Sequence, residues 1–181
     1  MGRAKQLIDL LGLPLVEHTV RTALRACRRV ILVQGAVDLG GVVPPREDLR
    51  IVENPRYREG QLGSLQRGIA ECTGESLFIM LADLPLVKEE TYRRLAAEIG
   101  DAAAAYPLFH GRRGHPVLVT TPAIERLRAA RPGERAMDVI APLLPRGVSV
   151  DDSGIYRDAD TPEELVGLAS QMDNSGRPGS R

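Results

Sequence analysis

Apolar residues in this chain fall into two kinds of stretch, short continuous runs and helical spacings. Continuous runs of the kind found in buried parallel strands occupy Arg29–Gly35 and Leu77–Ala82. Between these runs, the apolar positions of Leu15–Cys27 recur on one face of a helix, which predicts a surface helix packed on a sheet. Runs and helices that alternate in this way are typical of an open α/β sheet.

The alternation continues toward the carboxyl end of the chain. Further strands are expected at 51–52, 101–108, from 115 onward and at 147–150. Further helices are expected to begin near Ser64, after Asp83, at Thr121, near Glu134 and at the capping box Thr161–Glu164. The helix after Asp83 should bury Tyr92, Leu95, Ala96 and Ile99. We expect a single domain over residues 1–172 and a disordered, polar tail over 173–181.

Composition and charge exclude several classes of function. With 24 basic and 24 acidic residues, the chain lacks the basic field of nucleic-acid binders, so we expect no nucleic acid as a partner. No apolar run reaches the roughly 18 residues of a membrane helix, and no signal peptide opens the chain. We therefore expect a cytoplasmic protein with no membrane partner. Cys27 and Cys72 lack metal-ligand spacing and are expected to be reduced core thiols.

Asp83 is the first candidate for chemistry. It ends the apolar run at Leu77–Ala82, and Pro85 follows two residues later. Because ligands of open α/β sheets bind beyond the carboxyl ends of the strands, Asp83 would stand in the binding crevice. The alternative is that Asp83 and Pro85 only form a turn, in which both residue types are common.

Two further segments carry groups that suit phosphate. Lys5 follows a glycine-containing start and could reach phosphate from a loop, although an exposed lysine near a terminus is ordinarily just solvated. Gly60, Gly63 and Ser64 stand at a helix start, where backbone amides and the helix dipole favour a nucleotide's phosphate. The same residues also fit a capped helix with a flexible entry.

A basic segment with two glycines lies between two expected strands. Arg112 and Arg113 are bracketed by Gly111 and Gly114, and His115 follows. Guanidinium groups bind phosphate oxygens bidentately and glycines allow close approach, so this loop could hold an anionic substrate. The alternative is an exposed hairpin tip with solvated charges.

Asp158 and Asp160 precede the expected capping box, and capping does not account for them. Hard cations such as Mg²⁺ take one or two carboxylates together with substrate phosphates. The two aspartates could therefore complete a metal site with Asp83.

Five segments, taken in order, resemble one family of enzymes. They are MGRAKQL (1–7), ENPRYREGQLGSLQRG (53–68), ADLPLV (82–87), GRRGHPV (111–117) and DADTPEEL (158–165). Together they are similar to the nucleotidyltransferases of molybdenum cofactor maturation, the MobA-like NTP transferase family, and most of all to its molybdenum cofactor cytidylyltransferases. The resemblance runs from Met1 to about Ala169.

The resemblance implies a Rossmann-like, doubly wound, mostly parallel sheet with helices on both faces. It implies transfer of CMP from CTP to the phosphate of molybdenum-molybdopterin with release of pyrophosphate, and Mg²⁺ held by Asp83 with Asp158 or Asp160. Lys5 and Asp83 would be catalytic. The nucleotide would contact Gly2, Lys5, Asn54, Gly60, Ser64, Leu65 and Asp83, and the pterin would contact Arg112, Arg113, Gly114, His115 and Pro116. A molybdenum hydroxylase or its chaperone would be the protein partner.

The sequence also departs from that family. Its members carry an apolar strand and a Gly-rich loop ahead of the Met-Gly pair that matches Met1 and Gly2, and this sequence contains neither. We expect an exposed seam in the sheet, either because the recorded start lies downstream of the true one or because the chain is naturally truncated. Two alternatives stay open: a non-catalytic molybdenum cofactor carrier, and a nucleotidyltransferase that uses GTP or another NTP, or another small phosphorylated acceptor.

Overall fold

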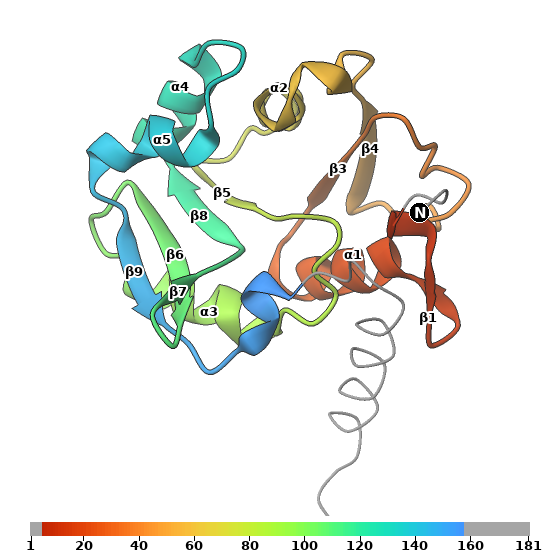
Figure 1. The fold of residues 1–181 in the computed structure, drawn as a ribbon, viewed down its shortest axis with the longest axis horizontal. Helices are drawn as coiled ribbons and strands as arrows, with labels where there is room; N and C mark the ends of the chain where they lie inside the picture. Colours follow the sequence, from red (N-terminus) through yellow and green to blue (C-terminus); the bar gives the residue numbers. More distant parts are fainter. Residues whose placement is uncertain (1–4, 158–181) are drawn as a thin grey trace, which may run out of the picture.

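The computed structural model describes residues 5–157, in which helices pack around two β-sheets, and a third sheet is a short two-stranded hairpin near the amino end (Figure 1). The larger sheet has the order β5-β8-β6-β7, and β9 also pairs with β6. Its strands are β5 (Ser76–Ile79), β6 (Ala104–Phe109), β7 (Arg112–Arg113), β8 (Val117–Thr120) and β9 (Arg146–Ser149). The smaller sheet consists of β3 (Val30–Gln34) and β4 (Leu49–Glu53).

The amino-terminal part consists of short elements that lead into the first helix. These are η1 (Lys5–Leu7), β1 (Asp9–Leu10), β2 (Leu13–Pro14) and α1 (Leu15–Ala26). The helix begins where predicted and ends one residue earlier, with Cys27 as its C-cap, and it buries Val16 and Val20 against Leu32 of β3. The β1–β2 hairpin was not predicted, and its turn places Gly12 at a φ of 83°.

The smaller sheet confirms two predicted strands. β3 and β4 run parallel in register from Val30 opposite Leu49 to Gln34 opposite Glu53. β4 is longer than the two residues expected because Leu49 and Arg50 also pair with β3. It is followed by η2 (Tyr57–Glu59) and α2 (Gln61–Ile69).

The larger sheet is mixed rather than mostly parallel, which corrects the expected strand directions. Only β6 and β9 pair in parallel, whereas β5–β8, β8–β6 and β6–β7 are antiparallel pairs. The short connection from β6 through β7 to β8 leaves no room for the crossover that parallel strands require. β5 also ends at Ile79 rather than Ala82, and none of its residues is buried.

Helices cover both faces of the larger sheet, as predicted. The helices are α3 (Glu89–Glu98), α4 (Thr121–Ala129) and α5 (Ala136–Ile140), followed by η3 (Ala141–Leu143), with η4 (Ser153–Tyr156) after β9. Ala104 and Tyr106 of β6 pack in one core cluster with residues of α2, α4 and α5, whereas Ala105 packs in another with Leu95 of α3. The α/β fold is therefore confirmed, with one apolar core on each face of the sheet.

Two details of the helices differ from the prediction. Ala96 is exposed because the buried face of α3 is narrower than the helical spacing suggested, and it is centred on Tyr92 and Leu95. The N-cap of α4 is Thr120 rather than Thr121, whose hydroxyl donates to the carbonyl of Glu75.

Several predicted features lie outside the described residues. They are Gly2, Asp158, Asp160, the capping box and the tail. Among residues 5–157, no helix is long and apolar enough to cross a membrane. Cys27 and Cys72 are both free thiols and partly buried, and burial raises the pKa of each.

Candidate functional site

Asn54 ties the end of β4 to the first turns of α2. Its side chain is buried, and its Nδ2 donates to the Ser64 hydroxyl over 2.9 Å. Its Oδ1 accepts from the backbone N–H of Arg56 over 3.0 Å, and its own N–H donates to the carbonyl of Gln34 at the end of β3. Two predicted nucleotide-binding residues, Asn54 and Ser64, are thus brought together.

The amino end of α2 is not capped by a side chain. Gly60 occupies the N-cap position with a φ of 119°, a conformation that favours glycine, and no side chain of residues 5–157 accepts a hydrogen bond there. The first amides of a helix have no intrahelical partner, and together with the helix dipole they suit an anion. The alternative interpretation, a capped helix with a flexible entry, stays open because Gly60 holds the cap position, and the Ser64 hydroxyl accepts from Asn54.

Asp83 and His115 lie together beyond the carboxyl end of β5. The His115 ring nitrogen Nδ1 lies 3.3 Å from the carbonyl oxygen of Ile79. Burial lowers the pKa of His115, while the Ile79 carbonyl and the negative charge of Asp83 oppose that shift. Among residues 5–157, the Asp83 carboxylate makes no hydrogen bond or ion pair.

A close backbone contact fixes the segment that carries His115. The N–H of His115 donates to the carbonyl of Ile155 over 2.7 Å. A Cβ at Gly114 would lie 2.3 Å from that same carbonyl oxygen, so only glycine fits there. The His115-Pro116 peptide bond is cis, and Pro116 is buried beside them.

Arg112 and Arg113 form the exposed strand β7 and rest on aromatic rings. The Arg112 guanidinium carbon lies 4.0 Å from the centre of the Tyr156 ring, and that of Arg113 lies 4.6 Å from the centre of the Tyr106 ring. The hairpin tip is present and exposed, as the alternative predicted, and each guanidinium group also contacts an aromatic ring.

The remaining predicted site residues make fewer contacts that bear on a ligand site. Lys5 begins η1, which contacts α1. Leu65 packs against the core cluster on the α2 side of the larger sheet, which gives it a structural role. Within residues 5–157, no three histidine, cysteine, aspartate or glutamate residues cluster in a way that could hold a metal ion. The site of Asp83 with Asp158 or Asp160 stays a prediction, since both partners lie outside that range.

A large hollow opens beside these residues. Its volume is about 1400 Å³, and its lining includes Gly60, Ser64 and His115 together with residues of β3 and β5. Figure 1 shows the two strands on opposite sides of this space, with α2 on one side and α1 on the other. The expected seam in the sheet is therefore present among the described residues.

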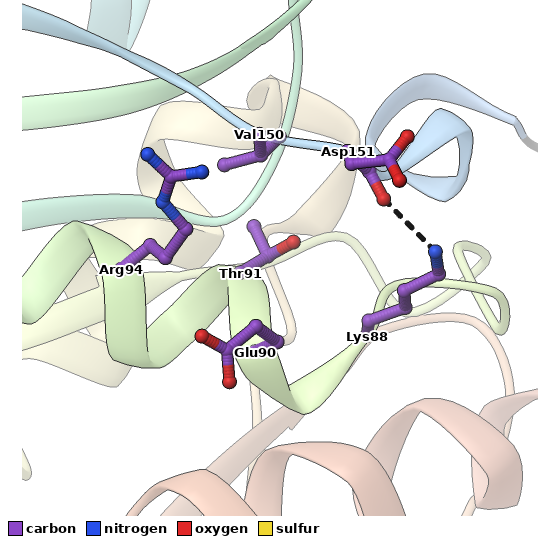
Figure 2. Close-up of a pocket in the computed structure, with 6 residues that line it drawn as sticks. All are labelled: Lys88, Glu90, Thr91, Arg94, Val150 and Asp151. Carbon is purple, nitrogen blue, oxygen red and sulfur yellow. Dashed lines mark hydrogen bonds between the residues drawn. The ribbon is translucent and has the colours of Figure 1, made fainter.

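A second, smaller hollow of about 310 Å³ lies over α3 (Figure 2). It is lined by Lys88, Glu90, Thr91, Arg94, Val150 and Asp151, and no predicted site residue takes part. The Lys88 ammonium donates to the backbone carbonyl of Asp151 over 2.9 Å.

Beside that hollow lies the buried Asp152, which was not predicted from the sequence as a functional residue. Its Oδ2 accepts from the N–H of Lys88 and the hydroxyl of Thr91, and its Oδ1 accepts from the N–H of Gly154. The spacing of Asp152 to Gly154, which is typical of an Asx turn, was the available signal. The link to α3 joins residues more than sixty positions apart and has no local signal.

Sequence comparison finds similar proteins over most of the chain. The profile of the family described as MobA-like NTP transferase domain matches residues 1–148. A molybdenum cofactor cytidylyltransferase of Escherichia coli strain K12 is 26% identical over 169 residues, which are 92% of this chain and 87% of the relative.

Solved structures share the fold. Rv0371c from Mycobacterium tuberculosis H37Rv has a TM-score of 0.80 at 20% identity, covering 94% of this chain and 90% of that one. Its complex with manganese has a TM-score of 0.71 at 22% identity, covering 93% of each chain. The Rossmann-like architecture is therefore confirmed despite the mixed strand directions.

Proposed function

The chain belongs to the MobA-like NTP transferase family, and on that premise we propose that it transfers CMP from CTP to the phosphate of molybdenum-molybdopterin. A phosphate oxygen of the acceptor would attack the α-phosphorus of CTP. The bond from that phosphorus to the bridging oxygen would break, and pyrophosphate would leave. The similarity to a molybdenum cofactor cytidylyltransferase supports the choice of both substrates.

One observation carries the proposal. The amino end of α2 follows β4 and is fixed by the Asn54–Ser64 hydrogen bond, and the Asp83 carboxylate follows β5. Within residues 5–157, no side chain caps that helix end and none pairs with that carboxylate. Nucleotidyl transfer depends on positioning and on neutralising phosphate charge more than on proton transfer. Helix amides, Lys5 and the arginines of β7 would supply that neutralisation, with Arg112, Arg113 and His115 on the side of the pterin.

We propose Mg²⁺ as the cofactor. The Asp83 carboxylate, which has no partner within residues 5–157, fits such an ion, because Mg²⁺ is commonly held by one or two carboxylates plus substrate phosphates. Bound there, the ion would neutralise phosphate oxygens. Asp158 or Asp160 stays the proposed second ligand. We also propose a cytoplasmic location and delivery of the product to a molybdenum hydroxylase or its chaperone.

Pyrophosphate release from CTP, GTP and ATP, measured with molybdenum-molybdopterin and with or without Mg²⁺, tests the proposal. We expect release from CTP that requires Mg²⁺ and falls roughly 100-fold or more in Asp83→Asn. Asp151→Asn removes the same charge from an exposed side chain outside the site and should leave the rate unchanged. Faster pyrophosphate release from GTP than from CTP would show that GTP is the nucleotide substrate.

A non-catalytic carrier of the cofactor is the second candidate. It is favoured by the large open hollow beside the proposed nucleotide site, together with the complete β7 hairpin at the proposed pterin site. If no nucleotide releases pyrophosphate, a thermal-shift titration with molybdenum-molybdopterin decides the matter. The carrier predicts binding that survives Asp83→Ala and is lost when Arg112 and Arg113 are both replaced by glutamine.

A further inference from the structure

The stretch between β5 and α3 carries Asp83 and passes α1 on its way to α3 (Figure 1). Residues 80–87 belong to no helix or strand, and within residues 5–157 no backbone–backbone hydrogen bond reaches them. Leu84 and Val87 fix the second half of the stretch by burying their side chains with Tyr92 of α3. The peptide that leads into Asp83 is therefore not held by backbone pairing.

Thr19 of α1 reaches that peptide. Its hydroxyl donates to the carbonyl oxygen of Ala82 over 3.2 Å, and no other side chain of residues 5–157 makes a hydrogen bond to the backbone of residues 80–87. The carbonyl of Ala82 and the N–H of Asp83 belong to one planar peptide unit, so a bond to the first fixes the orientation of the second. The hydroxyl thus acts on the backbone that carries the Asp83 carboxylate.

The hydrogen bond of Thr19 is not the one that a threonine usually makes inside a helix. Such a hydroxyl commonly donates to the carbonyl of its own preceding turn, whereas that of the buried Thr19 donates to a residue sixty-three positions away. The branched Cβ leaves few staggered χ1 positions in a helix, so the donor is already aimed and little rotamer freedom is lost. A buried donor with its acceptor directly before a candidate ligand indicates more than packing.

We propose that Thr19 is a positioning residue, which sets the direction of the Asp83 carboxylate by holding the peptide between Ala82 and Asp83. This inference rests on the proposed role of Asp83 as a ligand of the divalent metal ion. Thr19 itself would contact neither the ion nor a substrate. Groups that bind an ion must be held close to their productive geometry, so a mobile peptide at this point would weaken metal binding.

Thr22 offers a matched control on the same helix. It is 8% exposed against 5% for Thr19, and its hydroxyl accepts from Nη2 of Arg25 over 3.0 Å, away from residues 80–87. Valine keeps the branched shape of threonine but has no hydroxyl, so Thr19→Val and Thr22→Val each remove one hydrogen bond. We expect each to lower the melting temperature by no more than about 2–4 °C.

The metal probe is Mn²⁺, titrated into the full chain and followed by the electron paramagnetic resonance of the free ion. The part of the binding that Asp83→Asn removes defines the Asp83 site. At that site, Thr19→Val should raise the dissociation constant about threefold to tenfold, the range expected for loss of one hydrogen bond. Thr22→Val should leave the constant within about twofold of the parent value. Thr19→Ser keeps the hydroxyl and should do the same, although loss of a buried methyl group lowers its melting temperature.

A second measurement needs no metal. The order parameter of the Asp83 amide, from NMR relaxation, should be about 0.85 in the parent chain, as in rigid backbone, and should fall in Thr19→Val but not in Thr22→Val. If Asp83→Asn removes no metal binding, the proposed role of Asp83 fails, and the order parameter still decides whether Thr19 holds the peptide.

Two results would overturn the inference. One is an order parameter of Asp83 that is below about 0.6 in the parent chain or equal in the parent and Thr19→Val. The other is equal weakening of metal binding in Thr19→Val and Thr22→Val, because it would reflect a general loss of stability. If Thr19→Val does not fold, the order parameter of the parent chain and the metal affinity of Thr19→Ser carry the test.

Discussion

Asn54 follows the end of β4 and Asp83 follows the end of β5, yet the hydrogen bonding of their side chains differs. Both polar atoms of the Asn54 side chain are used, one by Ser64 and one by the backbone of Arg56. The Asp83 carboxylate has no hydrogen-bond partner within residues 5–157. Asn54 is therefore a positioning residue that shapes the start of α2, whereas the proposed role of Asp83 is to bind a ligand.

His115 predicts a pH dependence of stability. Burial lowers its pKa in the folded chain below the value of about 6.5 in the unfolded chain. The unfolded chain then binds the proton more readily, so stability is complete above about pH 6.5 and falls as the pH drops toward the folded pKa. We expect the melting temperature to fall from about pH 7.5 to 5.5, and His115→Gln to flatten that fall.

His110→Asn is the control for this pH series. His110 is exposed and has a φ of 48°, which asparagine tolerates, so the variant should retain the full pH-dependent fall. A flattened profile in His110→Asn and an unchanged one in His115→Gln would contradict the assignment.

Gly114 predicts a severe effect for one added methyl group. Its Cβ would lie 2.3 Å from the Ile155 carbonyl oxygen and 2.5 Å from Ile155 Cγ1. We expect Gly114→Ala to lower the free energy of unfolding by about 2 kcal/mol or more in urea denaturation, as overpacked sites do. Gly41→Ala, with no atom within 4 Å, should change it by less than about 0.5 kcal/mol. Similar losses in both variants would show that the backbone moves aside at Gly114.

At the scale of elements, Asp152 joins the segment after β9 to the start of α3. Its buried carboxylate accepts from Lys88 N–H over 2.8 Å, from the Thr91 hydroxyl over 2.6 Å and from Gly154 N–H over 2.9 Å. The segment between Asp83 and α3 ends at this contact. Asp152 therefore anchors the far end of the loop that carries the candidate ligand.

Removing the Asp152 carboxylate should lower the free energy of unfolding more than removing the carboxylate of Asp151. Asp152→Ala leaves three donors without their acceptor, and we expect a loss of roughly 3 kcal/mol in the free energy of unfolding. The side chain of Asp151 is exposed, so Asp151→Ala should stay within about 0.5 kcal/mol of the parent. Chemical denaturation of both variants measures the difference. Equal stabilities of the two variants would contradict the anchoring role of Asp152.

The elements that could be predicted are those whose signal is local. The apolar face of α1 and the branched run of β3 lie within single windows of sequence, and both elements were predicted within a residue or two. The neighbours of β5 could not be predicted, because its apolar run fits a parallel or an antiparallel partner equally well. Asp83 could be proposed from its place after that run, whereas Asp152 reaches α3 through residues more than sixty positions away.

At the scale of the whole molecule, the apolar core is divided. The larger sheet has a core cluster on each face, and β3 with α1 forms a cluster of its own around Val16 and Leu32. No strand within residues 5–157 connects the two sheets by hydrogen bonds. Cooperative units that share few bonds open with different free energies.

Native-state hydrogen exchange should therefore separate the two sheets. We expect the amide of Leu32 in β3 to exchange through an opening at least about 1 kcal/mol easier than that of Leu118 in β8. Both amides belong to paired strands, which makes them a matched pair. Identical opening free energies and identical denaturant dependence would show that the molecule opens as one unit.

The cation–π contacts of Arg112 and Arg113 determine how this protein could bind an anion. With 24 basic and 24 acidic residues the molecule carries no net charge, so long-range attraction contributes little. The rings of Tyr156 and Tyr106 already confine the two guanidinium groups, so less rotamer entropy remains to be lost when an anion arrives. Such a hairpin selects among anions after they have collided with it, by how well their oxygens fit the flat N–H edges of the two guanidinium groups. The rate at which an anion associates with it would change little with ionic strength.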